Sequence, residues 1–118
     1  MNIEDFRTYC LSKVGTTESM PFGGDILVFK VGTKMFALTD LEKFDSINLK
    51  CDPEKAIELR DQYDAVSAGY HMSKKHWNTV QTRGDVGVAL LKQWIDESYQ
   101  LVWESLTKKE KAELMAKS

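Results

Sequence analysis

Residues 26–51 constrain the fold most, because their side chains follow the two-residue period of β-strands. In residues 26–31 both sets of alternating positions are mainly apolar, which is typical of a strand covered on much of both faces. Gly32-Thr33 favours a two-residue hairpin turn, with glycine supplying a positive φ at its first position. Met35 to Thr39 predicts the returning strand and residues 46–51 a third one. This stretch therefore predicts an antiparallel meander.

Helical patterns stand on both sides of the meander. A first helix is predicted from a cap at Asn2 to Gly15, with an apolar face made of Ile3, Phe6, Cys10 and Val14. A second helix is predicted to begin at Asp52-Pro53-Glu54. Asp52 can cap the first backbone N–H groups, Pro53 stands in the first turn, where a missing N–H costs no hydrogen bond, and the charge of Glu54 is favourable at the positive end of the helix. After Asp64 the chain is predicted to be irregular.

The last third of the chain returns to strand and then to helix. Trp77 to Gln81 predicts a strand, and Gly84-Asp85 is expected to open a long helix. The pair Thr107 and Glu110 forms a capping box, which predicts a separate short helix to about Ala116. The apolar stripe of the long helix comprises Leu91, Trp94, Ile95, Val102 and Leu106.

These elements predict an α+β fold in which helices pack on an antiparallel sheet. Their order is helix, meander, helix, strand, helix, helix, and Thr16 to Met20 adds a short edge strand. A length of 118 residues is that of a single domain, which we expect to span residues 1–118.

The composition indicates an ordinary globular protein, with 42% hydrophobic and 29% charged residues. We find neither a membrane-spanning apolar run nor a signal peptide, so a cytoplasmic location is expected. Cys10 and Cys51 are interpreted as small buried apolar residues. The net charge of −2 means that any nucleic-acid site must be a local cationic patch.

Signals for catalysis and metal binding are missing from the sequence. There is no Gly-x-Ser-x-Gly nucleophile elbow, and the glycines in Pro21-Phe22-Gly23-Gly24 precede a strand instead of the helix that a phosphate loop requires. His71 and His76 lie five residues apart with no further ligand between them. We therefore expect no enzyme, no cofactor and no metal site.

Residues 66–84 are the most informative part of the chain for function. This segment contains no acidic residue, yet it holds Lys74, Lys75, Arg83 and both histidines beside Tyr70, Trp77 and Asn78. Basic charge next to aromatic and amide side chains suits phosphate contacts and base stacking. The competing interpretation is that Trp77 packs in the core and that Lys74-Lys75 is a solvated turn.

Five stretches carry a resemblance to a known family, in this order along the chain: Glu18–Gly23, Val31–Ala37, Ile47–Glu54, Gly69–Val80 and Asp96–Tyr99. In them the chain is similar to the MmcQ/YjbR family of small bacterial proteins. The resemblance implies a fold like the frataxin/CyaY class, with helices on one face of an antiparallel sheet. It also implies DNA binding through a double-wing arrangement of loops. By position it singles out Lys50, His71, Lys74, His76, Trp77 and Asn78.

The sequence thus yields two hypotheses for a non-catalytic domain that is a monomer or a weak dimer. The first is a DNA-binding module. The alternative is a domain that binds a protein or a small anionic ligand through the same patch. An unrecognised enzyme is a third, weaker hypothesis. The deciding question is whether the cations converge in the fold. The candidate residues are Lys50, His71, Lys74, Lys75, His76, Trp77, Asn78 and Arg83.

Overall fold

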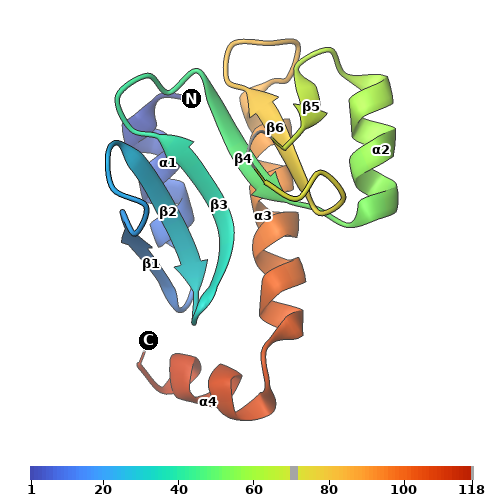
Figure 1. Ribbon diagram of the computed structural model, residues 1–118. Coiled ribbons are helices and arrows are strands. Elements are labelled where there is room, and N and C mark those ends of the chain that lie inside the picture. The colour runs from blue at the N-terminus through green and yellow to red at the C-terminus, as the bar shows by residue number, and fades with distance from the viewer. Residues whose placement is uncertain (70–71, 118) are drawn as a thin grey trace.

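A computed structural model describes residues 1–69 and 72–117 of the chain. The fold is α+β, as predicted, with runs of strands separated by helices (Figure 1). The elements in chain order are α1 (Ile3–Leu11), β1 (Thr16–Ser19), β2 (Ile26–Val31), β3 (Lys34–Asp40), β4 (Ser46–Lys50), α2 (Pro53–Gln62), β5 (Val66–Ala68), β6 (Trp77–Gln81), α3 (Val88–Ser105) and α4 (Lys108–Lys117).

The six strands form one antiparallel sheet in the order β1-β2-β3-β4-β6-β5. The predicted hairpin turn is confirmed, with Gly32 at a φ of 62°. The pairing of β2 with β3 contains a one-residue bulge: Phe29 faces Ala37 and Lys30 faces Met35, so Phe36 is the extra residue. The bulge allows Phe36 and Ala37 to join the same core although they are adjacent in a strand.

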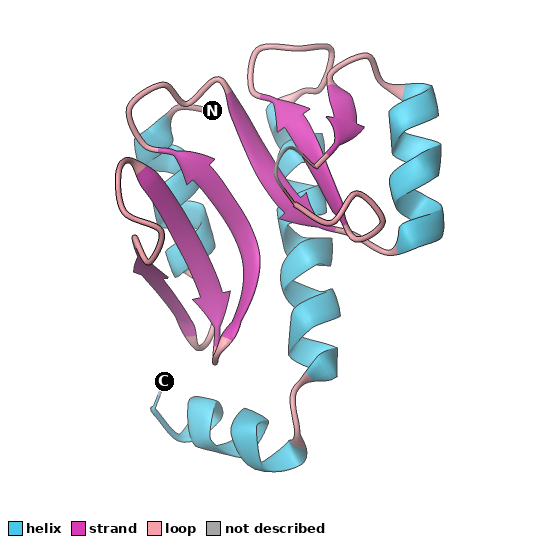
Figure 2. Ribbon diagram, viewed as in Figure 1, coloured by secondary structure: helices cyan, strands magenta, loops and turns pink. Residues whose placement is uncertain are grey.

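Helices α1, α2 and α3 pack on one face of this sheet, which confirms the predicted architecture. In Figure 2 the sheet is seen with α1 and α3 behind it. The core between the two layers contains Phe6 from α1, Leu59 from α2 and the predicted α3 stripe, packed on alternate side chains of the strands. On the opposite face, here called the open face, the described residues form a small buried cluster of Val28, Leu38 and Trp77.

The last helix confirms the capping-box prediction. The Thr107 N–H donates to Glu110 Oε1, and the Glu110 N–H donates to Thr107 Oγ1, both at 3.1 Å. Gly32 faces Leu106 and Leu114, so α4 lies beside the β2–β3 hairpin. Within the described residues no helix has both the length and the apolarity to cross a membrane.

Two predicted helix ends are wrong. Helix α3 begins at Val88 with Gly87 as its cap, not at Gly84-Asp85, because the Asp85 carboxylate accepts the N–H groups of Asp64 and Ala65 instead. Helix α1 ends at Leu11, which leaves Val14 exposed outside its apolar face.

The segment after Asp64, predicted to be irregular, contains the three-residue strand β5. The two cysteines differ from each other: Cys10 is buried as expected, whereas Cys51 is only partly covered, and both are free thiols.

Candidate functional site: a cationic cleft on the open face

A cleft of about 770 Å³ opens on the sheet where β3 and β4 diverge. The last pair between these strands is Ala37 with Leu49, so the start of β3 and the end of β4 have no partner across this gap. Figure 1 shows the two strands separating at this end, with α3 visible between them. Leu101 and Val102 of α3 therefore form part of the cleft wall.

The cleft is cationic. Lys30 of β2, Lys34 at the hairpin, Lys50 of β4 and His76 before β6 all line it, and Asp52 is the one acidic residue in its lining among the described residues. None of the three lysines pairs with a carboxylate in the described part of the chain. Three lysines from three segments therefore line one hollow surface.

Two of these lysines are held in place. The Lys50 Nζ lies 5.5 Å from the centroid of the Trp77 ring, a cation–π distance. The Lys34 Nζ donates to the carbonyl oxygen of Ser105 at 3.3 Å and to its Oγ at 3.2 Å. Both contacts use neutral partners, so they leave the charge of Lys50 available to an anion. The charge of Lys34 also attracts Glu110, where it adds to the hydrogen bonds from Thr107 in lowering the pKa of that carboxyl group.

Trp77 contributes to the cleft as a wall. Only 5% of the residue is exposed, and it packs with Val28 and Leu38 in the cluster of the open face. The prediction that this indole stacks on bases is not supported, since a stacking platform needs an accessible ring face. The competing interpretation, a tryptophan packed within a strand, describes its position.

Asn78 points away from the cleft. Successive strand residues face opposite sides of a sheet, so Asn78 faces the helices while Trp77 faces the open side. The residue is 2% exposed, and its side chain accepts a 2.7 Å hydrogen bond from Arg60 Nε and donates to the Ala56 carbonyl at 3.3 Å. Asn78 therefore has a structural role and does not line the cationic cleft.

The remaining predicted cations do not converge on one point. Lys74 and Lys75 are exposed in the turn that leads into His76. Arg83 lies beyond the opposite end of β6, beside a hollow that it shares with Asp45. Strand β6 alone separates these ends by about 13 Å. His71 lies outside the described residues.

The other end of the open face is acidic. A second hollow of about 610 Å³ is lined by Asp40 and Asp45, with Lys43 as its single cation among the described residues. Nearby, a hydrogen bond with Asp25 and the repulsion of that carboxylate raise the pKa of Glu42 above its usual value. The open face is therefore polarised, with a cationic and an anionic end.

Sequence interpretation missed Lys30 and Lys34. The alternation in β2 indicated that Lys30 faces away from Phe29 and Val31, and this was the available signal. The divergence of β3 from β4 leaves no comparable trace in the sequence, so the meeting of Lys30 with Lys50 required the structure.

The two thiols are poor candidates for nucleophiles. Burial raises the pKa of Cys10 to about 12, and burial also raises the pKa of Cys51. Both are therefore protonated at neutral pH, while the thiolate is the reactive form. Among the residues that the structure describes, no group of three His, Cys, Asp or Glu side chains could hold a metal ion.

Comparisons with known proteins agree with this fold. The family model described as YjbR matches residues 11–101. The uncharacterised protein YbdF of Escherichia coli O157:H7 is 41% identical over 91 residues, which cover 76% of this chain and 75% of the relative. The uncharacterised protein YjbR of Escherichia coli K12 is 32% identical over 101 residues, covering 85% and 86% of the two chains.

Solved structures give the same result. The crystal structure of Deinococcus radiodurans DR2400, a DUF419 domain, is 39% identical with a TM-score of 0.89, and the match covers 96% of this chain and 87% of that one. A crystal structure from Pseudomonas syringae, target PsR293, is 31% identical with a TM-score of 0.72, covering 86% and 98%.

Proposed function

This chain belongs to the YjbR family, and we propose that it is a non-catalytic domain that binds a small anionic ligand in the cationic cleft. The observation that carries this proposal is that Lys30, Lys34, Lys50 and His76 line one hollow, in which Asp52 is the single acid among the residues described. Ligand sites are typically concave, with a few polar groups that converge on the ligand among apolar ones, and this cleft has that character.

The charge of the cleft favours a phosphate group over a carboxylate. A phosphate monoester carries about −1.5 to −2 charges at neutral pH and three acceptor oxygens, which suits three ammonium groups. Exposed pairs of opposite charge are worth roughly 1 kcal/mol each in water. Three such pairs give a dissociation constant in the millimolar range. This constant increases as salt is added, because salt screens the charges and weakens binding.

Nucleic acid is the second candidate, and Lys74 and Lys75 support it. Both are exposed beside the cleft, and in the described residues neither pairs with a carboxylate. An extended polyanion that crossed the open face would, however, meet Asp40 and Asp45 at its far end. A small ligand avoids this repulsion, so we place it first. We also propose a cytoplasmic location, which two free thiols favour.

The test is a titration of the protein with methyl phosphate. Binding is measured from the amide chemical shifts in NMR spectra, at about 20 mM and about 200 mM salt. We expect saturable shifts around the cleft that weaken at the higher salt. The double variant Lys30→Gln/Lys50→Gln should reduce the affinity at least tenfold. The matched control Lys108→Gln/Lys109→Gln removes two exposed lysines of α4 and should leave it unchanged.

A duplex DNA titration separates the two candidates. The variant Lys74→Glu/Lys75→Glu should weaken any DNA binding and leave methyl phosphate binding largely intact. If DNA binds, depends on Lys74 and Lys75, and does not respond to Lys30→Gln/Lys50→Gln, nucleic acid replaces the small ligand as the proposed function. If methyl phosphate does not bind at low salt, the cleft is not an anion site.

A further inference from the structure

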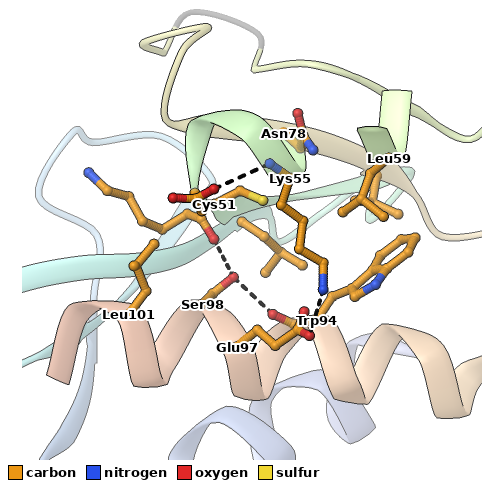
Figure 3. A pocket seen from close by; sticks show the side chains of 12 residues that line it. Cys51, Lys55, Leu59, Asn78, Trp94, Glu97, Ser98 and Leu101 are labelled. Carbon is orange, nitrogen blue, oxygen red and sulfur yellow. Dashed lines mark hydrogen bonds and ion pairs between the residues drawn. The ribbon is translucent and has the colours of Figure 1, made fainter. Parts of the chain in front are cut away.

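Another cavity, here called the rear cavity, lies behind the sheet, between α2 and α3 (Figure 3). Its volume is about 270 Å³. Its inner lining is mainly apolar, since the buried side chains of Leu49, Leu59, Val80 and Trp94 all contribute to it. For scale, an apolar cavity of roughly 150 Å³ is large enough to bind benzene. The space can therefore take a six-carbon chain or a single ring.

This rear cavity adjoins the cationic cleft. Lys50, Cys51, Asp52 and Leu101 line both spaces, so the end of β4 and one position of α3 form the boundary between them. Figure 3 labels Cys51 and Leu101 among the side chains that line the rear cavity. The four shared residues place the two spaces side by side.

An ion pair stands at the rim of the rear cavity. The Lys55 Nζ lies 2.9 Å from Glu97 Oε1, joining α2 to α3, and both side chains are 41% exposed. This hydrogen bond raises the pKa of Lys55. Half-exposed ion pairs contribute little to stability, so the pair can open at low cost to admit a ligand. The deeper polar group Ser98 is already satisfied, because its hydroxyl donates to the Lys50 carbonyl at 2.6 Å.

We propose that the ligand of this domain is an amphipathic phosphomonoester, whose phosphate sits in the cationic cleft and whose short apolar group enters the rear cavity. The inference rests on the proposed function, because the cleft must first hold the anionic group. It adds the class of ligand: an alkyl or single-ring aryl group of about six carbons. Neither space alone explains why an apolar cavity adjoins a cluster of three lysines.

The experiment compares hexyl phosphate with methyl phosphate on the full chain. Both carry the same anionic group, and they differ by five methylene groups. Fully burying one methylene improves affinity about fourfold, so partial burial of five should improve it at least tenfold. The second readout is alkylation of Cys51 by iodoacetamide, which hexyl phosphate should slow more than methyl phosphate does at equal occupancy.

Two variants on α3 localise the effect. Leu101→Trp places an indole at the boundary of the two spaces and should abolish the gain of hexyl over methyl phosphate. Because Leu101 is 39% exposed, the larger side chain has room to be accommodated without unfolding. Gln100→Trp is the matched control, since Gln100 is exposed on the same helix and lines neither space. This control should keep the gain.

The outcomes separate the two proposals. If methyl phosphate binds in the cleft but hexyl phosphate binds no more tightly, the inference is wrong and the proposed function stands. The same conclusion follows if the gain survives Leu101→Trp, because the alkyl group then lies elsewhere. If neither ligand binds at low salt, both proposals fail. A tenfold or larger gain that Leu101→Trp removes and Gln100→Trp keeps supports the inference.

Discussion

Replacing Asn78 by alanine separates a structural role from a ligand-binding role at a residue that the sequence assigned to nucleic acid. In the structure the Asn78 side chain accepts a hydrogen bond from the Arg60 guanidinium and donates one to the Ala56 carbonyl. It is almost completely buried. We therefore expect Asn78→Ala to destabilise the domain while the folded fraction binds methyl phosphate, which occupies only the cleft, with unchanged affinity.

The magnitude follows from these two hydrogen bonds. A hydrogen bond to a charged group contributes about 1.5–3 kcal/mol and a neutral one about 0.5–1.5 kcal/mol. The second bond of Asn78 is long, at 3.3 Å, so its contribution lies at the low end. The free energy of unfolding should therefore fall by about 2–4 kcal/mol. Urea denaturation, followed by circular dichroism, measures this change directly.

Asn48→Ala is the matched control, because Asn48 lies on the neighbouring strand β4 but faces the open side. Its Oδ1 accepts one neutral hydrogen bond, from Thr79 Oγ1 at 2.6 Å. Its replacement should cost about 1 kcal/mol. The reasoning is refuted if Asn78→Ala leaves the urea midpoint unchanged, or if the two variants cost the same. A fall in affinity of folded Asn78→Ala for methyl phosphate would also contradict it.

Two further predictions concern ionisable groups. The hydrogen bond from Arg7 lowers the pKa of Glu18 below its usual value of 4.5. The pair therefore stabilises the fold fully above pH 4.5, and this contribution is lost as the pH falls through the pKa of Glu18 in the folded protein. Below about pH 4.5 the unfolding free energy should fall more steeply with acid in the wild type than in Glu18→Gln; equal slopes would contradict this. Iodoacetamide should modify Cys51 but not Cys10 in the native protein, and faster at higher pH, because Cys10 is fully buried and burial raises both thiol pKa values. Mass spectrometry that finds both thiols modified at equal rates would show the packing around Cys10 to be wrong.

The helices and most strands could be predicted because their signals are local. Each of these signals depends on residues that are close together in the chain. They are the alternation in residues 26–51, the proline at the start of α2 and the capping box of α4. The wrong start of α3 arose because a side chain has a distant partner. Asp85 looked like the start of α3, yet its carboxylate binds the backbone that precedes β5, about twenty residues earlier in the chain.

The cleft was only partly predictable, because its cations come from separate strands. Lys50 and His76 belonged to the predicted set, while Lys30 and Lys34 did not. Their meeting depends on the bulge at Phe36 and on the divergence of β3 from β4 beyond Ala37. Both features are consequences of how the strands pair, and pairing is a non-local property that composition and spacing do not specify.

The acid-free run before and within β6 illustrates why a continuous stretch of sequence need not form a continuous surface. Lys74 and Lys75 point to solvent, Trp77 closes the cleft wall, and Asn78 binds the helix layer on the other side of the sheet. The two-residue period of a strand imposes this division, whatever the ligand. A small anion needs only the cleft, whereas a polyanion must also engage the exposed turn. The charge changes at Lys30 and Lys50 therefore test a different surface from those at Lys74 and Lys75. Comparing the affinity lost in the two variants shows whether the ligand is confined to the cleft or also extends over the turn.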